Sequence, residues 1–255
     1  MTQLRRGARV LRIGHRGGGA LAPENTLAAF KRTIEVGVDF VEFDVLDLDD
    51  GTLVLAHSDD LHEVSHGGAD GRVRSLRLDA LREVAPGLPT LEEALGFLST
   101  AGVGLHADVK SPRHGRDIAL ALRRHGVVER TVASSFWTSA LRDLRAEEPR
   151  LALGITYPED RRGLARRRLL TPLVPSVVAV LAQALPRRLP RWLRSTGATV
   201  AMLHYAVLSR AAVGRCHETG AGVWAWTVND ADELRRVVDL GVDGVISDDP
   251  RLFLQ

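Results

Sequence analysis

Three carboxylate residues stand in two apolar runs of the sequence. Glu42 and Asp44 are two positions apart in the run 39–45, so in a β-strand both side chains point to the same face. Asp108 stands at the end of a second run, 102–109. If these runs are neighbouring strands, the three carboxylates converge and repel one another unless a cation or a shared proton lies between them. Ligands that are all oxygen favour Mg²⁺ or Ca²⁺ over zinc.

Histidine, arginine and lysine side chains also stand at or just after the ends of the apolar runs. His15 and Arg16 follow the first apolar run and precede three glycines, which would let the main chain approach a ligand. Lys110 lies two residues beyond Asp108, and His57 closes a segment after the second run. A cation with Arg16 would neutralise a phosphate group, and two histidines could act as general base and general acid on opposite sides of phosphorus. Each residue alone is commonly a turn or an exposed edge residue, but their occurrence at three successive strand ends favours a site.

Eight short apolar runs alternate with stretches of helical periodicity. The runs are 9–14, 39–45, 102–109, 130–136, 151–156, 198–204, 222–228 and 243–247. Strands that alternate with helices pair in parallel, and eight of them in about 250 residues is typical of a (β/α)8 barrel. We therefore predict an α/β fold, a TIM barrel in a single domain over residues 1–255, with an open doubly wound sheet as the alternative. The carboxyl ends of barrel strands share one face, where the polar residues would meet.

A small hairpin is predicted directly after the second strand. Residues 47–57 contain Asp50 followed by Gly51, which is a strong hairpin signal. The chain is therefore expected to turn back, and the hairpin ends at His57.

A long helical insertion, about 157–197, is predicted between strands five and six. Within it, residues 161–194 hold nine arginines and no acidic residue, and 169–186 are uncharged. Four prolines between 172 and 190 predict short pieces rather than a straight membrane-spanning helix. Either the segment packs its apolar side on the barrel, or it lies at a membrane surface with its arginines on anionic headgroups.

Composition excludes some classes of function. The chain has 34 basic and 32 acidic residues and a net charge of +2, which gives little reason to expect nucleic acid as a partner. Cys216 is the only cysteine, so no intrachain disulfide forms and a reducing compartment fits. No signal peptide is recognisable at the start of the sequence. We expect a cytoplasmic protein, with peripheral membrane contact through 161–194 as the open question.

Five blocks of the sequence carry a family resemblance. In order they are GHRGGGALAPENTLAAF, VEFDVLDLDDGTLVLAH, HADVK, WAWTVND and GVDGVISDDP. Together they resemble the signature blocks of the glycerophosphodiester phosphodiesterase family over nearly the whole chain. The resemblance implies a TIM barrel that hydrolyses glycerophosphodiesters, which are small-molecule or lipid phosphodiesters, to an alcohol and glycerol 3-phosphate. It also implies a divalent cation, Mg²⁺ or Ca²⁺, as cofactor.

The resemblance also implies a role for each matching residue. The roles are the acid/base pair His15 and His57, the metal ligands Glu42, Asp44 and Asp108, and the substrate contacts Arg16, Lys110 and Trp226. Two positions depart from the family pattern. Ser58 follows His57 where the family usually has an aspartate, and Asp59 or Asp60 is expected to compensate. Asp108 stands where the family usually has the longer glutamate.

Three other functions remain as alternatives. A lysophospholipase D-type activity on lysophospholipids would use the same barrel, and the 161–194 segment favours it. A catalytically silent barrel that binds phosphodiesters would not need two histidines and three carboxylates. An unrelated metal-dependent barrel hydrolase would need an HxH pair, which the sequence lacks.

Overall fold

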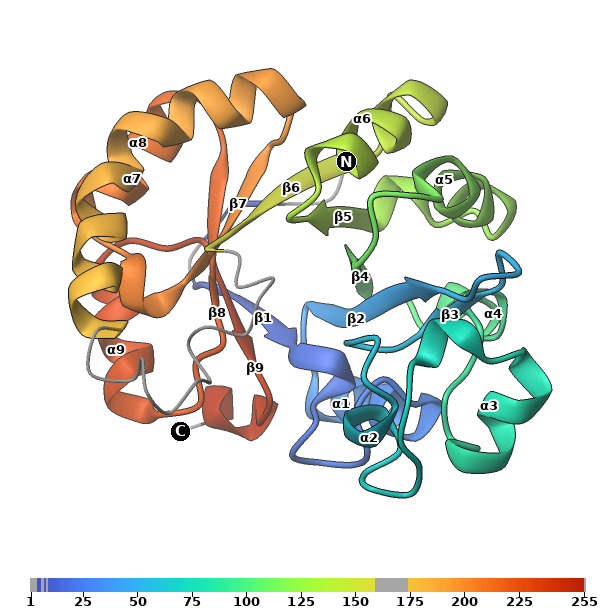
Figure 1. The fold of residues 1–255 in the computed structure, drawn as a ribbon. Coiled ribbons are helices and arrows are strands. Elements are labelled where there is room, and N and C mark those ends of the chain that lie inside the picture. Colours follow the sequence, from blue (N-terminus) through green and yellow to red (C-terminus); the bar gives the residue numbers. More distant parts are fainter. Residues whose placement is uncertain (1–3, 6, 8, 159–173, 255) are drawn as a thin grey trace.

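The computed structural model describes residues 4, 5, 7, 9–158 and 174–254, in which eight parallel strands close into a barrel (Figure 1). The barrel strands are β1 (Leu11–Gly14), β2 (Phe40–Asp47), β4 (Gly104–Val109), β5 (Thr131–Ser135), β6 (Ala152–Tyr157), β7 (Val200–His204), β8 (Gly222–Trp226) and β9 (Gly244–Ser247). Each overlaps one predicted run, so the predicted (β/α)8 fold is confirmed.

The barrel is closed by β1. Ile13 on this strand lies opposite Phe40 of β2 on one side and opposite Ile246 of β9 on the other. An open doubly wound sheet would leave two unpaired edges, so that alternative is wrong. Inside the barrel, Phe40 packs edge-on against Trp224, which is fully buried. These large side chains fill the interior, as in other barrels of eight strands.

Helices surround the strands in Figure 1. They are α1 (Leu27–Val36), α2 (Leu61–Val64), α3 (Leu78–Val84), α4 (Leu91–Ser99), α5 (Gly115–Arg124), α6 (Thr138–Glu147), α7 (Val174–Thr196), α8 (Arg210–Glu218) and α9 (Ala231–Asp239). Their apolar faces and the outer faces of the strands form the larger core. A helix that buries one face and solvates the other suits the amphipathic periodicity of the sequence.

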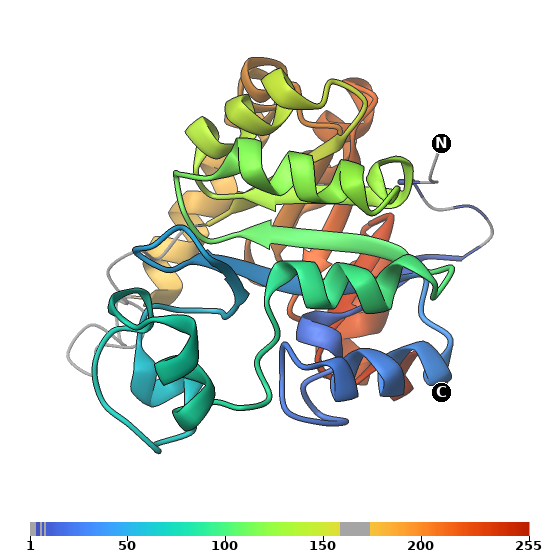
Figure 2. The same cartoon turned by 90° about the vertical axis from the view of Figure 1, so that its right-hand side faces the viewer.

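The hairpin predicted after β2 is confirmed, and it forms part of a larger excursion, residues 48–90, between β2 and α4. Strand β3 (Leu53–Leu55) pairs antiparallel with β2, and the chain then forms α2 and α3 before it returns to the barrel at α4. The apolar side chains of this excursion make a small core of their own, around residues such as Leu61, Val73 and Leu81. In Figure 2 the excursion (teal) lies at the side to which the green strand arrows point. It therefore stands beside the carboxyl ends of the barrel strands.

The expectation that prolines divide the 157–197 insertion into short pieces is wrong for its second half. Residues 174–196 form one helix, α7, with Pro186 and Pro190 inside it. Leu185, Leu189 and Leu193 are buried at intervals of four, so packing on the barrel holds the helix together in spite of the missing main-chain donors. The first half of the insertion, residues 159–173, lies outside the described residues. None of the described helices is long and apolar enough to cross a membrane.

Candidate active site at the carboxyl end of the barrel

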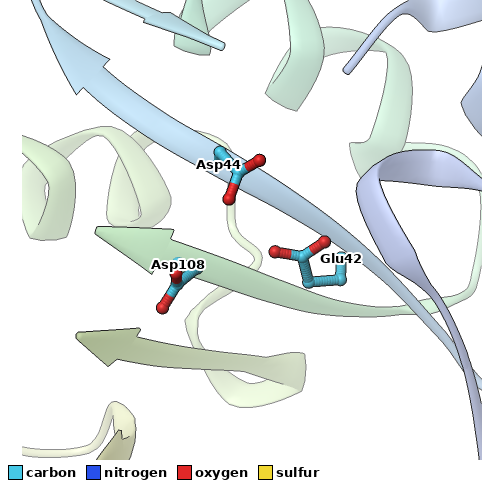
Figure 3. A group of neighbouring side chains, drawn as sticks. All are labelled: Glu42, Asp44 and Asp108. Carbon is cyan, nitrogen blue, oxygen red and sulfur yellow. The ribbon is translucent and has the colours of Figure 1, made fainter. Parts of the chain in front are cut away.

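Three carboxylates from neighbouring strands meet at the carboxyl end of the barrel (Figure 3). Glu42 and Asp44 extend from β2, and the parallel register places Asp108 of β4 directly opposite Asp44. All three are buried, and one oxygen atom from each lies within 4.8 Å of the others. Such a set repels itself without a counter-charge and suits a hard cation that prefers oxygen ligands. The structure thus brings together the three residues predicted to bind a metal.

Two cationic side chains lie against these carboxylates. Lys110 Nζ is 2.7 Å from Asp44 Oδ1 and also pairs with Asp108. Arg16 Nε lies 3.3 Å from Asp44 Oδ2, and the main-chain N–H of Arg16 donates to Glu42 Oε2 at 2.6 Å. The site therefore holds positive groups that could contact a phosphate once a metal cation balances the carboxylates.

Burial and neighbouring charges together set the pKa values of these groups. Burial works to raise the pKa of Asp44, but Lys110 and Arg16 outweigh it and hold that pKa well below its usual range. Burial together with the charge of Asp44 raises the pKa of Glu42 well above its usual range. Burial works to lower the pKa of Lys110, but Asp108 and Asp44 outweigh it and raise that pKa. At neutral pH the ammonium group is therefore charged, and Glu42 is the carboxylate that most readily takes up a proton.

The turn that carries Arg16 depends on close packing against α1. Arg16 has a φ of 51°, and Gly17 and Gly18 have φ values of 77° and 81°. A Cβ on Gly17 would lie 2.5 Å from a ring carbon of Phe30, and one on Gly18 would lie 2.5 Å from Thr33 Oγ1. These two glycines therefore serve the left-handed turn and its contact with the helix. That the main chain also approaches a ligand at these glycines stays a prediction.

His15 is held by a carboxylate from the far end of the chain. Its Nδ1 lies 2.5 Å from Asp248 Oδ1, and Asn229 donates to the other oxygen of the same carboxylate. A proton held on Nδ1 leaves Nε2 as the nitrogen that can face a substrate. Burial lowers the pKa of His15, and the hydrogen bond with Asp248 only partly offsets this. The sequence did not indicate Asp248 as the partner of His15, although this residue lies in the block GVDGVISDDP.

His57 has an equivalent partner, and it is neither of the expected aspartates. Glu63 Oε1 lies 3.1 Å from His57 Nδ1, and Ser58 Oγ donates to Glu63 Oε2 at 3.0 Å. Asp60 instead caps α2, and Asp59 pairs with an arginine of the excursion. Because Asp60 caps the helix that begins at Leu61, the first turn brings Glu63 back towards the imidazole. A polar residue three positions after a capping aspartate is the signal that could have indicated this contact.

The shorter side chain of Asp108 is supported by its neighbours. Ser134 on the adjacent strand β5 donates a hydrogen bond to Asp108 Oδ1, and His106 Nε2 lies 2.8 Å from Ser134 Oγ. Burial lowers the pKa of His106 to about 4, so this imidazole is neutral at pH 7. On the other side of the site, Asn25 donates to Asp44 Oδ2 at 2.9 Å. The carboxylates are therefore held in place by partners that the sequence motifs did not identify.

A central cavity of about 130 Å³ opens among these groups. Its walls include most of the predicted site residues: His15, Arg16, Glu42, His57, Asp108, Lys110 and Trp226. Asp44 lies behind this surface, fully buried. Trp226 lines this cavity, and its Nε1 is buried without a hydrogen-bond partner among the described residues. The sequence predictions thus fall on one cavity, with Asp44 directly beneath it.

Both the sequence and the fold of this chain match those of known proteins. A model of the glycerophosphoryl diester phosphodiesterase family matches residues 15–252. The glycerophosphodiester phosphodiesterase of Caldanaerobacter subterraneus is 27% identical over 96% of this chain and 97% of its own length. The solved structure of the enzyme of that name from Thermotoga maritima has a TM-score of 0.71 at 25% identity and covers 98% of this chain and 99% of its own. A protein from Silicibacter pomeroyi has a TM-score of 0.77 at 26% identity, over 98% and 95% of the two chains.

Proposed function

The chain belongs to the glycerophosphoryl diester phosphodiesterase family, and we propose that its central cavity hydrolyses glycerophosphodiesters with a divalent cation and two histidines. The enzyme is a phosphoric diester hydrolase, and the products would be an alcohol and glycerol 3-phosphate. The observation that carries the proposal is the convergence of three buried carboxylates, within 4.8 Å, with Lys110 and Arg16. Glu42, Asp44 and Asp108 would hold Mg²⁺ or Ca²⁺.

The bound cation would supply Lewis-acid stabilisation of the charge that develops on the phosphoryl oxygens. Arg16 and Lys110 would bind the non-bridging oxygens, and the side chain of Trp226 would line the pocket around the substrate. Because the donors are held in a buried site, little reorganisation is needed when charge develops. The chain's own groups thereby orient the phosphate between the two histidines.

His15 and His57 are proposed to exchange protons with the two sides of phosphorus. In the first step a glycerol hydroxyl attacks phosphorus, one histidine takes its proton, and the other protonates the departing alcohol oxygen. A cyclic phosphate remains. In the second step the two roles reverse, so that water opens the ring and glycerol 3-phosphate forms. The carboxylates at both Nδ1 atoms support this, because they orient each Nε2 and stabilise each imidazolium.

The proposal is tested by release of glycerol 3-phosphate from a panel of glycerophosphodiesters, with and without chelator. We expect turnover with Mg²⁺ or Ca²⁺ and none by metal-free protein in excess EDTA. His15→Ala and His57→Ala should each lower kcat by about 10²–10⁴-fold, whereas His62→Ala, on the exposed side of α2, should not. Full turnover in EDTA would refute the metal requirement, and normal turnover by His57→Ala would refute the histidine pair.

The same panel decides between the alternatives. Release of the head group from lysophospholipids, with lysophosphatidate as the other product, would identify a lysophospholipase D-type activity. Saturable binding of phosphodiesters without any product, in the presence of either cation, would identify a catalytically silent barrel. The paired carboxylates and histidines support turnover.

A separate proposal concerns the surface of α7, for which we infer contact with anionic membranes. Val177 and Val180 are 53% and 64% exposed. The same helix continues into exposed arginines at 187, 188, 191 and 194. Each cation near an anionic surface contributes up to about 1 kcal/mol. The protein should sediment with anionic vesicles at low salt and be released at high salt, and Val177→Asp with Val180→Asp should weaken this. Failure of the intact protein to sediment would refute membrane contact.

A further inference from the structure

A second cavity opens directly beside the central one. It has a volume of about 520 Å³, against about 130 Å³ for the central cavity. It lies between the excursion and the residues that lead into α1. At one point these two walls touch, because a Cβ on Gly87 would lie 3.3 Å from Thr26 Cγ2. The cavity is thus a space between two packed elements, and its size is typical of a ligand site.

The walls of this second cavity are mainly apolar. The apolar side chains come from α1, the residue after β3, α2, the end of α3 and the segment that follows it: Leu27, Ala28, Ala56, Val64, Val84 and Leu88. Three of the charged or amide side chains around it are held by other residues. Glu24 binds Arg16, Asn25 binds Asp44, and Glu63 lies against His57. Apart from the exposed His66, a ligand here would therefore meet mainly carbon surface.

His57 belongs to the walls of both cavities. A substrate that places its phosphorus in the central cavity, with one ester oxygen at His57, can therefore continue into the apolar cavity. The surroundings of His15 are different. A polar cavity there is lined by Asn229, Asp248 and Asp249. The two histidines thus face two chemically distinct spaces.

We infer that the apolar cavity receives the leaving alcohol and that this alcohol carries an apolar chain or ring. The inference rests on the proposed function, in which each histidine serves one ester side of phosphorus. Glycerol has free hydroxyl groups and matches the polar cavity at His15. The other alcohol then lies at His57, where an alkyl or aryl group would lose contact with water against Val64, Val84 and Leu88. His15 accordingly takes the glycerol hydroxyl proton, and His57 protonates the departing oxygen.

The test is a series of glycerol 3-phosphate esters with ethanol, butanol, hexanol and octanol, each used below its aggregation concentration. Wild-type kcat/KM for release of glycerol 3-phosphate should rise about three- to fourfold for each buried methylene, until the cavity is filled. A flat or falling series would overturn the inference. A control ester carries the octyl chain on the glycerol and ethanol as leaving group, and a comparable gain with this control would also overturn it.

Two matched variants locate the effect. Ala28 and Ala211 are each the second residue of a helix, α1 and α8, and both are exposed, but only Ala28 lines the apolar cavity. Ala28→Trp fills the cavity and should abolish the gain with chain length, whereas Ala211→Trp should retain it. Equal slopes for the two variants would overturn the inference.

The wild-type series gives a result even if Ala28→Trp does not fold. It also separates the inference from the proposed function. Turnover of the ethyl ester with a flat series overturns the cavity assignment alone. Absence of glycerol 3-phosphate from every ester, with either cation present, overturns both.

Discussion

Replacing Lys110 with methionine removes the ammonium group that lies among the buried carboxylates. Its Nζ is 2.7 Å from Asp44 Oδ1 and also pairs with Asp108, and only 14% of the side chain is exposed. Methionine keeps most of the side-chain volume and removes the charge. We expect the variant without divalent cations to be less stable than the wild type, because buried carboxylates lose a counter-ion.

The expected loss of stability follows from the burial of the contact between Lys110 and the carboxylates. Removing one partner of a buried ion pair costs about 3–5 kcal/mol. The unfolding entropy of the 255-residue chain is about 0.5 kcal/mol/K, from about 2.1 cal/mol/K per residue. The melting temperature in EDTA should therefore fall by about 6–9 °C. Arg16, with Nε 3.3 Å from Asp44 Oδ2, remains as a counter-charge and favours the lower end of this range.

The assay is thermal unfolding followed by circular dichroism, in EDTA and in excess Mg²⁺ or Ca²⁺. Lys31→Met is the matched control, because Lys31 is the only other lysine and is exposed on α1. A cation bound by the carboxylates restores the missing positive charge, so it should raise the melting temperature of Lys110→Met more than that of the wild type. Two results would refute the reasoning: Lys110→Met melting in EDTA at the temperature of the control, or the same cation-induced increase in both proteins.

Other predictions concern the histidines. Glu63→Gln should lower kcat about 10–100-fold, as for other partners that orient a functional histidine, and unchanged kcat would show that His57 needs no carboxylate. Asp248 raises the pKa of His15 against the larger effect of burial, so Asp248→Asn should move the acidic limb of the kcat/KM profile to lower pH; an unmoved limb would exclude His15 as the base. His106 has a pKa of about 4 when folded and about 6.5 when unfolded, so the unfolded chain takes up a proton first as pH falls. Urea unfolding of the wild type should therefore lose about 2 kcal/mol between pH 7 and pH 5 relative to His106→Gln, and an equal loss in both would contradict the buried neutral imidazole.

The fold and the acidic cluster could be predicted from local sequence patterns. Alternation of apolar runs and helical stretches indicates parallel strands, and eight of them indicate a barrel. The spacing of Glu42 and Asp44 places both on one face of a strand, since side chains alternate along it. Asp108 joins them because the next barrel strand runs in parallel and in register. The periodicity of each strand and the order of strands along the chain can be read from local sequence patterns.

The partners of the histidines depended on tertiary structure. Asp248 is 233 positions from His15, and no local spacing indicates that their side chains touch. Glu63 reaches His57 because it lies in the first turn of α2, which Asp60 caps, whereas the sequence offered two closer aspartates. The sequence also indicated several broken pieces where α7 is one helix with two internal prolines.

The apolar cavity shows the same division most clearly. Ala28 and Val84 are unremarkable in the sequence, and each would pass for an ordinary residue of an amphipathic helix. They face a common space only because the excursion after β2 packs beside the start of α1. Periodicity determines which face of an element is apolar, but the packing of whole elements decides which of those faces leave a space between them. The sequence by itself therefore determined the barrel and its acidic centre, whereas the tertiary structure decided the partners of the histidines and the cavity beside them.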